Sequence, residues 1–174
     1  METGGVASVA HELMEDPSLE IADARSGGPL HELLDAWLAW PKQGRLPPRA
    51  AFDPVDFPRL LPWIGLIEFD GHPNRHRRYD ALYRYVGSTR AELFKTTRMT
   101  GRYVSSLLDP ERWFGVYDAL IARRAPLVVR GRPYRVGKAF LRFEMLMLPL
   151  CRNDDVEGRD IAFNLSYVQV EPAN

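Results

Sequence analysis

Apolar residues recur at helical spacing in two segments of the chain. In residues 29–40 they recur every three or four positions, Pro29 suits the first turn, and Pro41 ends the segment. Residues 109–124 begin with Asp-Pro, which suits an N-cap followed by the first helical residue. We therefore predict two amphipathic helices. Their apolar faces consist of Leu30, Leu33, Leu34, Trp37 and Leu38 in the first helix and Trp113, Val116, Tyr117 and Leu120 in the second.

Short apolar runs bounded by turn-forming residues predict strands before and after the second helix. Two runs precede it, joined by the polar segment GHPNRHRR, and three follow it. Between the first helix and these strands, five prolines from position 47 to position 62 exclude a regular helix or a central strand. We predict an extended connector there. The predicted strands are residues 63–70, 79–86, 127–136, 140–150 and 161–170.

This order of elements predicts an α+β fold. We expect a five-stranded antiparallel sheet with helices inserted between the second and third strands, plus the N-terminal amphipathic helix. Helices inserted there would cover one face of the sheet and enclose a core that can hold a ligand. The acidic N-terminal residues end in ARSGGP and are predicted to be flexible. The predicted segments are residues 1–28 (flexible and acidic), 29–62 (helix and Pro-rich connector), 63–170 (core) and 171–174 (tail).

The composition narrows the class of protein without indicating a function. Its 23 basic residues balance 23 acidic residues over 174 positions, so nothing global favours nucleic acid or a membrane surface. The single cysteine, Cys151, excludes an internal disulfide framework and fits a reducing compartment. No apolar run approaches the roughly 18 residues of a membrane-spanning helix, and the N-terminus lacks the pattern of a secretory signal. We therefore expect a cytoplasmic protein of one domain.

Four short motifs follow one another within residues 30–170. They are GRLPPRAAFDPVDFPRLLPWIGLIEF (44–69), YRYVGS (83–88), MTGRY (99–103) and EMLMLPL (144–150). These motifs and the order of elements resemble PAS domains, in particular a proteobacterial subfamily of short, mostly stand-alone PAS proteins. The subfamily pattern runs Arg-x-Leu-Pro-x-Arg, Asp-Pro, Leu-Leu-Pro, Tyr-Arg-x-x-Gly-Thr, Thr-Gly and Leu-Pro-Leu. Ser88 stands where the motif Tyr-Arg-x-x-Gly-Thr has its threonine. The matching residues are Arg45, Leu46, Pro47, Arg49, Asp53, Pro54, Leu60, Leu61, Pro62, Tyr83, Arg84, Gly87, Thr100, Gly101, Leu148, Pro149 and Leu150.

The resemblance implies a bacterial signalling or ligand-sensing domain rather than an enzyme. It also implies that the second strand ends at the mouth of a ligand pocket, where Gly87 allows a sharp turn into a short helix. It supplies no ligand, since the physiological role of this subfamily is largely undefined. We expect action through homodimerisation or contact with a downstream signalling protein, without binding to nucleic acid or membranes.

A small organic ligand would lie between the long helix and the sheet. Strand alternation predicts that Tyr83 and Tyr85 share one face of the second strand, and that Met145 and Met147 share one face of the fourth. An arginine buried there, with Arg98 as the candidate, would indicate an anionic ligand such as a carboxylate. The same side chains would also form an ordinary core. The candidate ligand-binding residues are Tyr83, Tyr85, Arg98, Tyr103, Trp113, Tyr117, Phe143, Met145 and Met147.

The sequence identifies no cofactor or metal site. The histidines lie outside residues 109–124, where a haem ligand is expected, and Cys151 does not lie in the helix motif of a flavin photosensor. His72 and His76 are four residues apart, but Pro73 between them excludes the helical arrangement of metal ligands. Haem, flavin and metal are therefore not expected, and an unidentified small organic ligand stays open.

Three functions remain as alternatives. The first is a sensor that dimerises through the N-terminal helix and a sheet face, whether that helix packs on its own chain or on a partner. The second is an interaction module with a filled core, using the sheet face or the basic loop at residues 75–78. The third is an isomerase or hydratase with Glu144 or Asp118 facing the core. The candidate dimer-interface residues are Leu30, Leu33, Leu34, Trp37 and Trp40.

Overall fold

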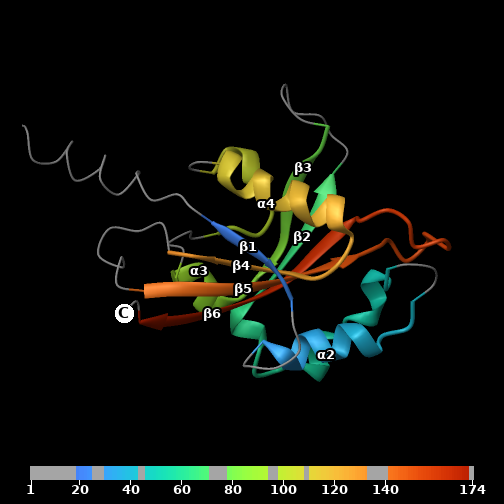
Figure 1. The fold of residues 1–174 in the computed structure, drawn as a ribbon, viewed down its shortest axis with the longest axis horizontal. Helices are drawn as coiled ribbons and strands as arrows, with labels where there is room; N and C mark the ends of the chain where they lie inside the picture. The colour runs from blue at the N-terminus through green and yellow to red at the C-terminus, as the bar shows by residue number, and fades with distance from the viewer. Residues whose placement is uncertain are drawn as a thin grey trace, which may run out of the picture.

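The computed structural model of the chain describes residues 19–24, 30–42, 46–70, 78–93, 98–107, 110–132 and 141–172. Over this part of the chain, an antiparallel sheet of six strands in the order β1-β4-β5-β6-β2-β3 lies between helices (Figure 1). The strands are β1 (Glu20–Asp23), β2 (Ile64–Asp70), β3 (Asp80–Val86), β4 (Leu127–Gly131), β5 (Leu141–Leu150) and β6 (Phe163–Pro172). The α-helices are α2 (His31–Ala39), α3 (Ser88–Leu93) and α4 (Pro110–Arg123).

The predicted α+β class is confirmed, but the sheet has six strands where five were predicted. The additional strand is β1, which lies in the segment predicted to be flexible and pairs with the edge of β4. Glu20 and Asp23 at its ends form ion pairs with Arg130 and Arg123. A strand of four residues is too short to show a clear alternation of apolar and polar side chains. Its stability comes instead from pairing with residues about a hundred positions away, which no local pattern reveals. The rest of the predicted flexible segment lies outside the described residues.

The centre of the sheet is formed by β5 and β6, which pair along their entire length. Strand β2 lies between β3 and the last strand, β6, so segments from the middle and the end of the chain are paired in the sheet. The β2–β3 pairing shifts register between Leu66 and Ile67, so that Leu66 pairs with Tyr85 and Ile67 with Tyr83. A bulge of this kind breaks the alternation of side chains. The prediction that Tyr83 and Tyr85 share a face is therefore wrong.

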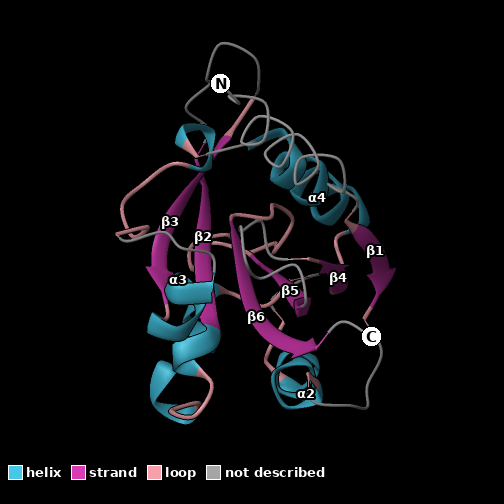
Figure 2. Cartoon of the chain, turned by 90° about the vertical axis from the view of Figure 1, so that its left-hand side faces the viewer, coloured by secondary structure: helices cyan, strands magenta, loops and turns pink. Residues whose placement is uncertain are grey.

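One face of the sheet, here called the α2 face, is covered by α2 and the Pro-rich connector (Figure 2). The connector forms the 3₁₀ helices η1 (Arg49–Ala51), η2 (Pro54–Asp56) and η3 (Leu61–Trp63). The Trp37 indole N–H donates to the carbonyl oxygen of Pro149 at 3.0 Å, which fixes α2 on β5. The buried residues of this face are Leu30, Leu33, Leu34, Trp37, Leu46, Phe52, Phe57, Leu60, Ile64, Leu66, Val128, Leu146, Leu148, Leu150, Cys151, Leu165 and Tyr167.

The residues predicted for a dimer interface therefore pack within their own chain. Leu33 is fully buried and Trp37 is 6% exposed against the sheet of the same chain. Trp40, at the end of α2, is half-buried and makes a tilted ring contact with Phe52 and an edge contact with Phe57. An apolar helix face needs one apolar partner, and here the sheet supplies it.

The opposite face, here called the α4 face, is covered by α3 and α4 (Figure 2). The helix predicted at 109–124 is observed as α4, and its buried face includes Phe114, which the spacing pattern missed. The buried residues of this core are Ile67, Phe69, Ala81, Tyr83, Leu93, Met99, Val104, Phe114, Val116, Tyr117, Leu120, Leu127, Val129, Phe143, Met145, Met147 and Val168.

Gly87 joins β3 to α3 where the backbone runs against η3. A Cβ atom at this position would overlap the carbonyl oxygens of Leu61 and Pro62. The Gly87 N–H donates to the Ile64 carbonyl at 2.8 Å, which holds the two segments together. Glycine is thus required here for close backbone approach. This contact fixes the start of α3 and so the direction in which its side chains reach the sheet.

Candidate functional site

A buried arginine lies at the centre of the α4 face. Arg90, on α3, is only 4% exposed, and its guanidinium lies against the backbone of Gly65 in β2. A Cβ atom added to Gly65 would lie 2.6 Å from both Cζ and Nη1 of Arg90. The absence of a side chain at Gly65 therefore creates the space that the guanidinium occupies.

The guanidinium is bound by neutral groups. Nη1 donates to the Ser166 hydroxyl at 2.6 Å, and that hydroxyl donates to the Gly65 carbonyl at 3.3 Å. Nη2 contacts the Met145 sulfur at 3.6 Å, which is a weak acceptor. Among the described residues, no carboxylate lies within ion-pair distance of Arg90. Burial lowers the pKa of Arg90, and the two tyrosines near it partly offset this effect.

Those tyrosines are Tyr83 from β3 and Tyr117 from α4, whose hydroxyls lie close enough to influence each other's pKa. Both are buried in the α4 face. Burial raises the pKa of Tyr83 and raises that of Tyr117 well above its ordinary value, although the charge of Arg90 acts in the opposite direction. Both hydroxyls are therefore neutral at physiological pH, and they do not compensate the charge of Arg90.

A buried amide completes the polar cluster. Asn164 on β6 is fully buried, and neither its Nδ2 nor its Oδ1 has a hydrogen-bond partner in the part of the chain that the structure describes. It pairs in register with Ile67, which in turn pairs with Tyr83, and it lies two residues before Ser166 on the same face of β6. The cluster is here called the Arg90 cluster and consists of Tyr83, Arg90, Tyr117, Asn164 and Ser166.

The structure brings five of the nine predicted ligand-binding residues together in the buried core of the α4 face: Tyr83, Tyr117, Phe143, Met145 and Met147. Trp113 is half-buried at its margin and stacks on Phe143, with 6.2 Å between ring centroids.

The other three predicted ligand-binding residues lie elsewhere. Tyr85 is exposed and donates to the Leu61 carbonyl, because the β2–β3 bulge turns it away from Tyr83. Arg98 is exposed with a φ of 61°, in the left-handed region, so it is not the buried arginine. Tyr103 is half-buried and donates to Asp70 at the end of β2.

Sequence reasoning missed Arg90, Asn164 and Ser166. Arg90 precedes the buried Leu93 by three positions, so an arginine on the apolar face of a short helix was the available signal. Asn164 and Ser166 alternate with apolar residues, a pattern typical of a strand with one solvated face. Their burial follows from the central position of β6 and from the cover that α4 provides, which are non-local features.

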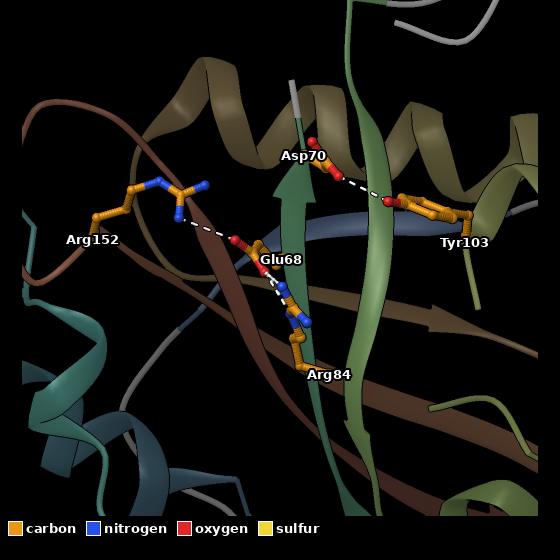
Figure 3. A network of polar contacts seen from close by, with 5 residues as sticks. All are labelled: Glu68, Asp70, Arg84, Tyr103 and Arg152. Atoms are coloured by element: carbon orange, nitrogen blue, oxygen red, sulfur yellow. Dashed lines mark hydrogen bonds and ion pairs between the residues drawn. The ribbon is translucent and has the colours of Figure 1, made fainter. Parts of the chain in front are cut away.

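A second polar network, on β2 and the edge strand β3, provides a contrast. Figure 3 shows Glu68 of β2 between Arg84 of β3 and Arg152, which follows β5. The two arginines bind different oxygens of the Glu68 carboxylate and are half exposed to solvent. In the same view, Tyr103 donates to Asp70 at 2.8 Å, and this bond raises the pKa of Tyr103. Each charge of the Glu68 group has an opposite charge beside it, as expected of a structural network.

The other residues considered for catalysis or reactivity lie outside the Arg90 cluster. Glu144 forms an ion pair with Arg130 at 2.7 Å and alternates with Met145, so it does not face α4. Asp118 is exposed and accepts from Tyr79 at 2.6 Å. Cys151 is buried, with its sulfur 3.6 Å from the Leu46 carbonyl oxygen, and burial raises its pKa. His72 and His76 lie outside the described residues.

The donors of the Arg90 cluster can bind an anion. Within the described ranges, no group of three or more His, Cys, Asp or Glu side chains is arranged to hold a metal ion, and no helix is long and apolar enough to cross a membrane.

Comparisons of the chain with protein-family models, with curated proteins and with solved structures gave no match. The geometry of the cluster is therefore the basis for a functional proposal.

Proposed function

We propose that this chain is a PAS-type sensory or signalling domain. It binds a small molecule between α4 and the sheet, and it transmits the signal through dimerisation or contact with a partner protein. The order of strands and helices and the motifs shared with stand-alone PAS proteins support this proposal. A free, buried Cys151 is consistent with a reducing, cytoplasmic location.

The observation that carries the proposal is the burial of Arg90 without an acidic partner among the described residues. Replacing even a paired buried charge by an apolar side chain of similar volume is often neutral or stabilising. A core selected only for packing would therefore have little reason to keep an arginine there. A core that binds a ligand does have a reason to keep a buried arginine, because stability is commonly given up at functional sites.

The output surface in this proposal is the uncovered end of the α2 face. A groove of about 610 Å³ lies there, lined by Trp63, Glu144 and residues 167–171. Glu144 also lines two neighbouring depressions that include Arg130. Mixed charges beside the half-buried ring of Trp63 suit a protein partner or a second copy of the chain. The apolar side of α2 is buried on its own sheet, so the proposal does not place the output surface there.

Native mass spectrometry of protein purified gently from its host tests the proposal, together with an absorption spectrum of the same sample. The proposal predicts a mass excess that disappears on denaturation, and a change of oligomeric state or partner binding when that ligand is removed. A constant apo mass, combined with an oligomeric state that no extract of small molecules changes, would contradict it.

An interaction module with a filled core is the second candidate. The observation in its favour is that Tyr83, Tyr117 and Met145 pack closely around Arg90. In that case Arg90→Met would leave partner binding unchanged, whereas a sensor would lose its response to ligand. A catalytic role for Glu144 is not proposed, because this carboxylate lies on the face opposite the Arg90 cluster and is neutralised by Arg130.

A further inference from the structure

Two buried groups of the Arg90 cluster lack the partners that their chemistry requires. Among the described residues, Arg90 has no counter-charge, and neither polar atom of the Asn164 amide has a hydrogen-bond partner. The two lie close together, since Arg90 binds Ser166, and Asn164 lies two residues before Ser166 on the same face of β6, about 7 Å along the strand. A small group bound beside Ser166 is therefore within reach of both side chains.

The contact between Arg90 and Met145 indicates where that group would bind. Nη2 of Arg90 faces the thioether sulfur at 3.6 Å, and a thioether is a far weaker acceptor than an oxygen. Methionine side chains are unbranched and change rotamer easily, and Met147 lies next to Met145 on the same face. An oxygen atom of a ligand can thus replace the sulfur while Met145 moves aside.

The charge of the site selects the ligand class. Arg90 carries a positive charge, and the hydroxyls of Tyr83 and Tyr117 are neutral, so a cationic ligand would be repelled. The planar guanidinium fork matches the two oxygens of a carboxylate, and the Asn164 Nδ2 supplies a further donor. The neighbouring buried side chains of the same core are apolar and include Met145, Met147 and Val168.

We infer that the ligand of this domain is a small monocarboxylate with a short apolar tail, bound through Arg90 and Asn164. The guanidinium donates to the carboxylate in place of the Met145 contact, and the Asn164 amide donates to the same group. The apolar tail lies among the methionines and Val168. This inference rests on the proposed function and names the class of ligand that the same site takes.

The first test uses acetate, butanoate and hexanoate as sodium salts, with hexanamide as a neutral isostere and sodium chloride as an inorganic anion. Binding to the full chain is measured by calorimetry and by thermal unfolding. We expect affinity to rise with tail length from acetate to hexanoate. Because charge-assisted hydrogen bonds contribute more than neutral ones, hexanamide is expected to bind roughly tenfold or more weakly than hexanoate.

Variants of the chain test whether hexanoate binds at Arg90 and Asn164 or nonspecifically elsewhere on the protein. Arg90→Gln and Asn164→Leu should each weaken hexanoate binding by roughly 10- to 100-fold, the value of a hydrogen bond to a charged group. Asn164→Leu removes unsatisfied atoms, so it should fold at least as well as the natural chain and give a clear binding result. Arg142→Gln, an exposed arginine on β5, is the matched control and should bind normally. With methyl-labelled methionine, hexanoate should shift the Met145 and Met147 signals.

The outcomes distinguish this inference from the function on which it rests. The inference is overturned if none of the carboxylates binds, if hexanamide or chloride binds as well as hexanoate, or if Asn164→Leu and Arg90→Gln bind normally. If a co-purifying ligand is then found to be neutral or cationic, the sensory function stands and only the carboxylate class is wrong. If no ligand of any class is found, both proposals fail.

Discussion

The two faces of one sheet are built on different principles. On the α2 face every buried residue of the cluster is a hydrophobe or a tyrosine, and the buried indole of Trp37 has its hydrogen bond. On the α4 face the same strands present Asn164 and Ser166, and α3 adds Arg90. The α2 face shows that this sheet can be covered by apolar packing alone. The polar centre of the α4 face is therefore not required by the fold.

The paired charges of the Glu68 network sharpen this comparison. Arg84 and Arg152 share the carboxylate of Glu68, and both remain half exposed to solvent. Arg90 is buried away from solvent, and no carboxylate among the described residues forms an ion pair with it. Arginines near the sheet edge thus follow the usual rule for stability, and the arginine at its centre departs from it. Departures of this kind are expected at functional sites.

The largest effect should come from a charge placed in the α2 face. Leu33→Glu would bury a carboxylate without a partner, and we expect a loss of about 4 kcal/mol or more, enough to prevent folding. Leu38→Glu is the control, because Leu38 is 54% exposed on the same helix and should change stability by less than about 0.5 kcal/mol. Circular dichroism with urea unfolding measures both. Equal stability of the two variants would contradict the packing of α2 on its own sheet.

Gly65→Ala should have the next largest effect, because the new methyl group would displace the Arg90 guanidinium. We expect a loss of about 1–3 kcal/mol in the free energy of unfolding. The loss should shrink in an Arg90→Met background, which gives a coupling energy between the two positions. Gly115→Ala in α4 is the control, since its added methyl meets open space and should stabilise the helix by roughly 0.5–1 kcal/mol. An uncoupled Gly65→Ala would show that Arg90 does not lie there.

Arg90→Met should raise the free energy of unfolding by about 1 kcal/mol, because it removes a buried charge while keeping most of the volume. Arg84→Met is the matched change in the Glu68 network, and it should lower stability by roughly 0.5 kcal/mol. Urea unfolding of both variants gives the comparison directly. If Arg90→Met is destabilised by more than Arg84→Met, Arg90 serves the fold and the contrast between the faces is lost.

The smallest effect concerns alkaline pH. The folded-state pKa of Tyr117 is raised well above its unfolded value, so its contribution to stability is complete below the unfolded pKa and decreases as pH rises above it. The loss should begin as the pH passes the ordinary tyrosine pKa of about 10 and should grow as the pH rises further. Tyr117→Phe should reduce this decline relative to the natural chain, because it removes the buried hydroxyl. Urea unfolding between about pH 8 and pH 11 measures the slopes. Equal slopes in the variant and the natural chain would place Tyr117 in contact with solvent.

Local patterns predicted the fold class and most elements. The strands β2, β3, β5 and β6 and the helix α4 lie within two residues of their predicted bounds at nearly every end, because each carries its own apolar run or helical spacing. Strand β1 was missed because only its pairing with β4 makes it a strand. The relation to PAS domains stays a prediction, supported by the order of elements and the motifs.

The polar centre could not be predicted in the same way. Sequence reasoning expected a buried arginine to indicate an anionic ligand, but it selected Arg98, which is exposed. The burial of Arg90 depends on the close approach of Gly87 to η3 and on the missing side chain at Gly65. The bulge that turns Tyr85 outward depends on pairing with β2. Each of these is a contact between segments, and residue spacing along one segment does not encode it.

The central claim is that the α4 face gives up stability in order to bind a carboxylate at Arg90. Urea unfolding of the natural chain and of Arg90→Met, each with and without sodium hexanoate, tests it most directly. We predict that Arg90→Met is the more stable protein without hexanoate and that hexanoate stabilises only the natural chain, as linkage requires for a ligand of the folded state. A less stable Arg90→Met, with no effect of hexanoate on either protein, would contradict the account.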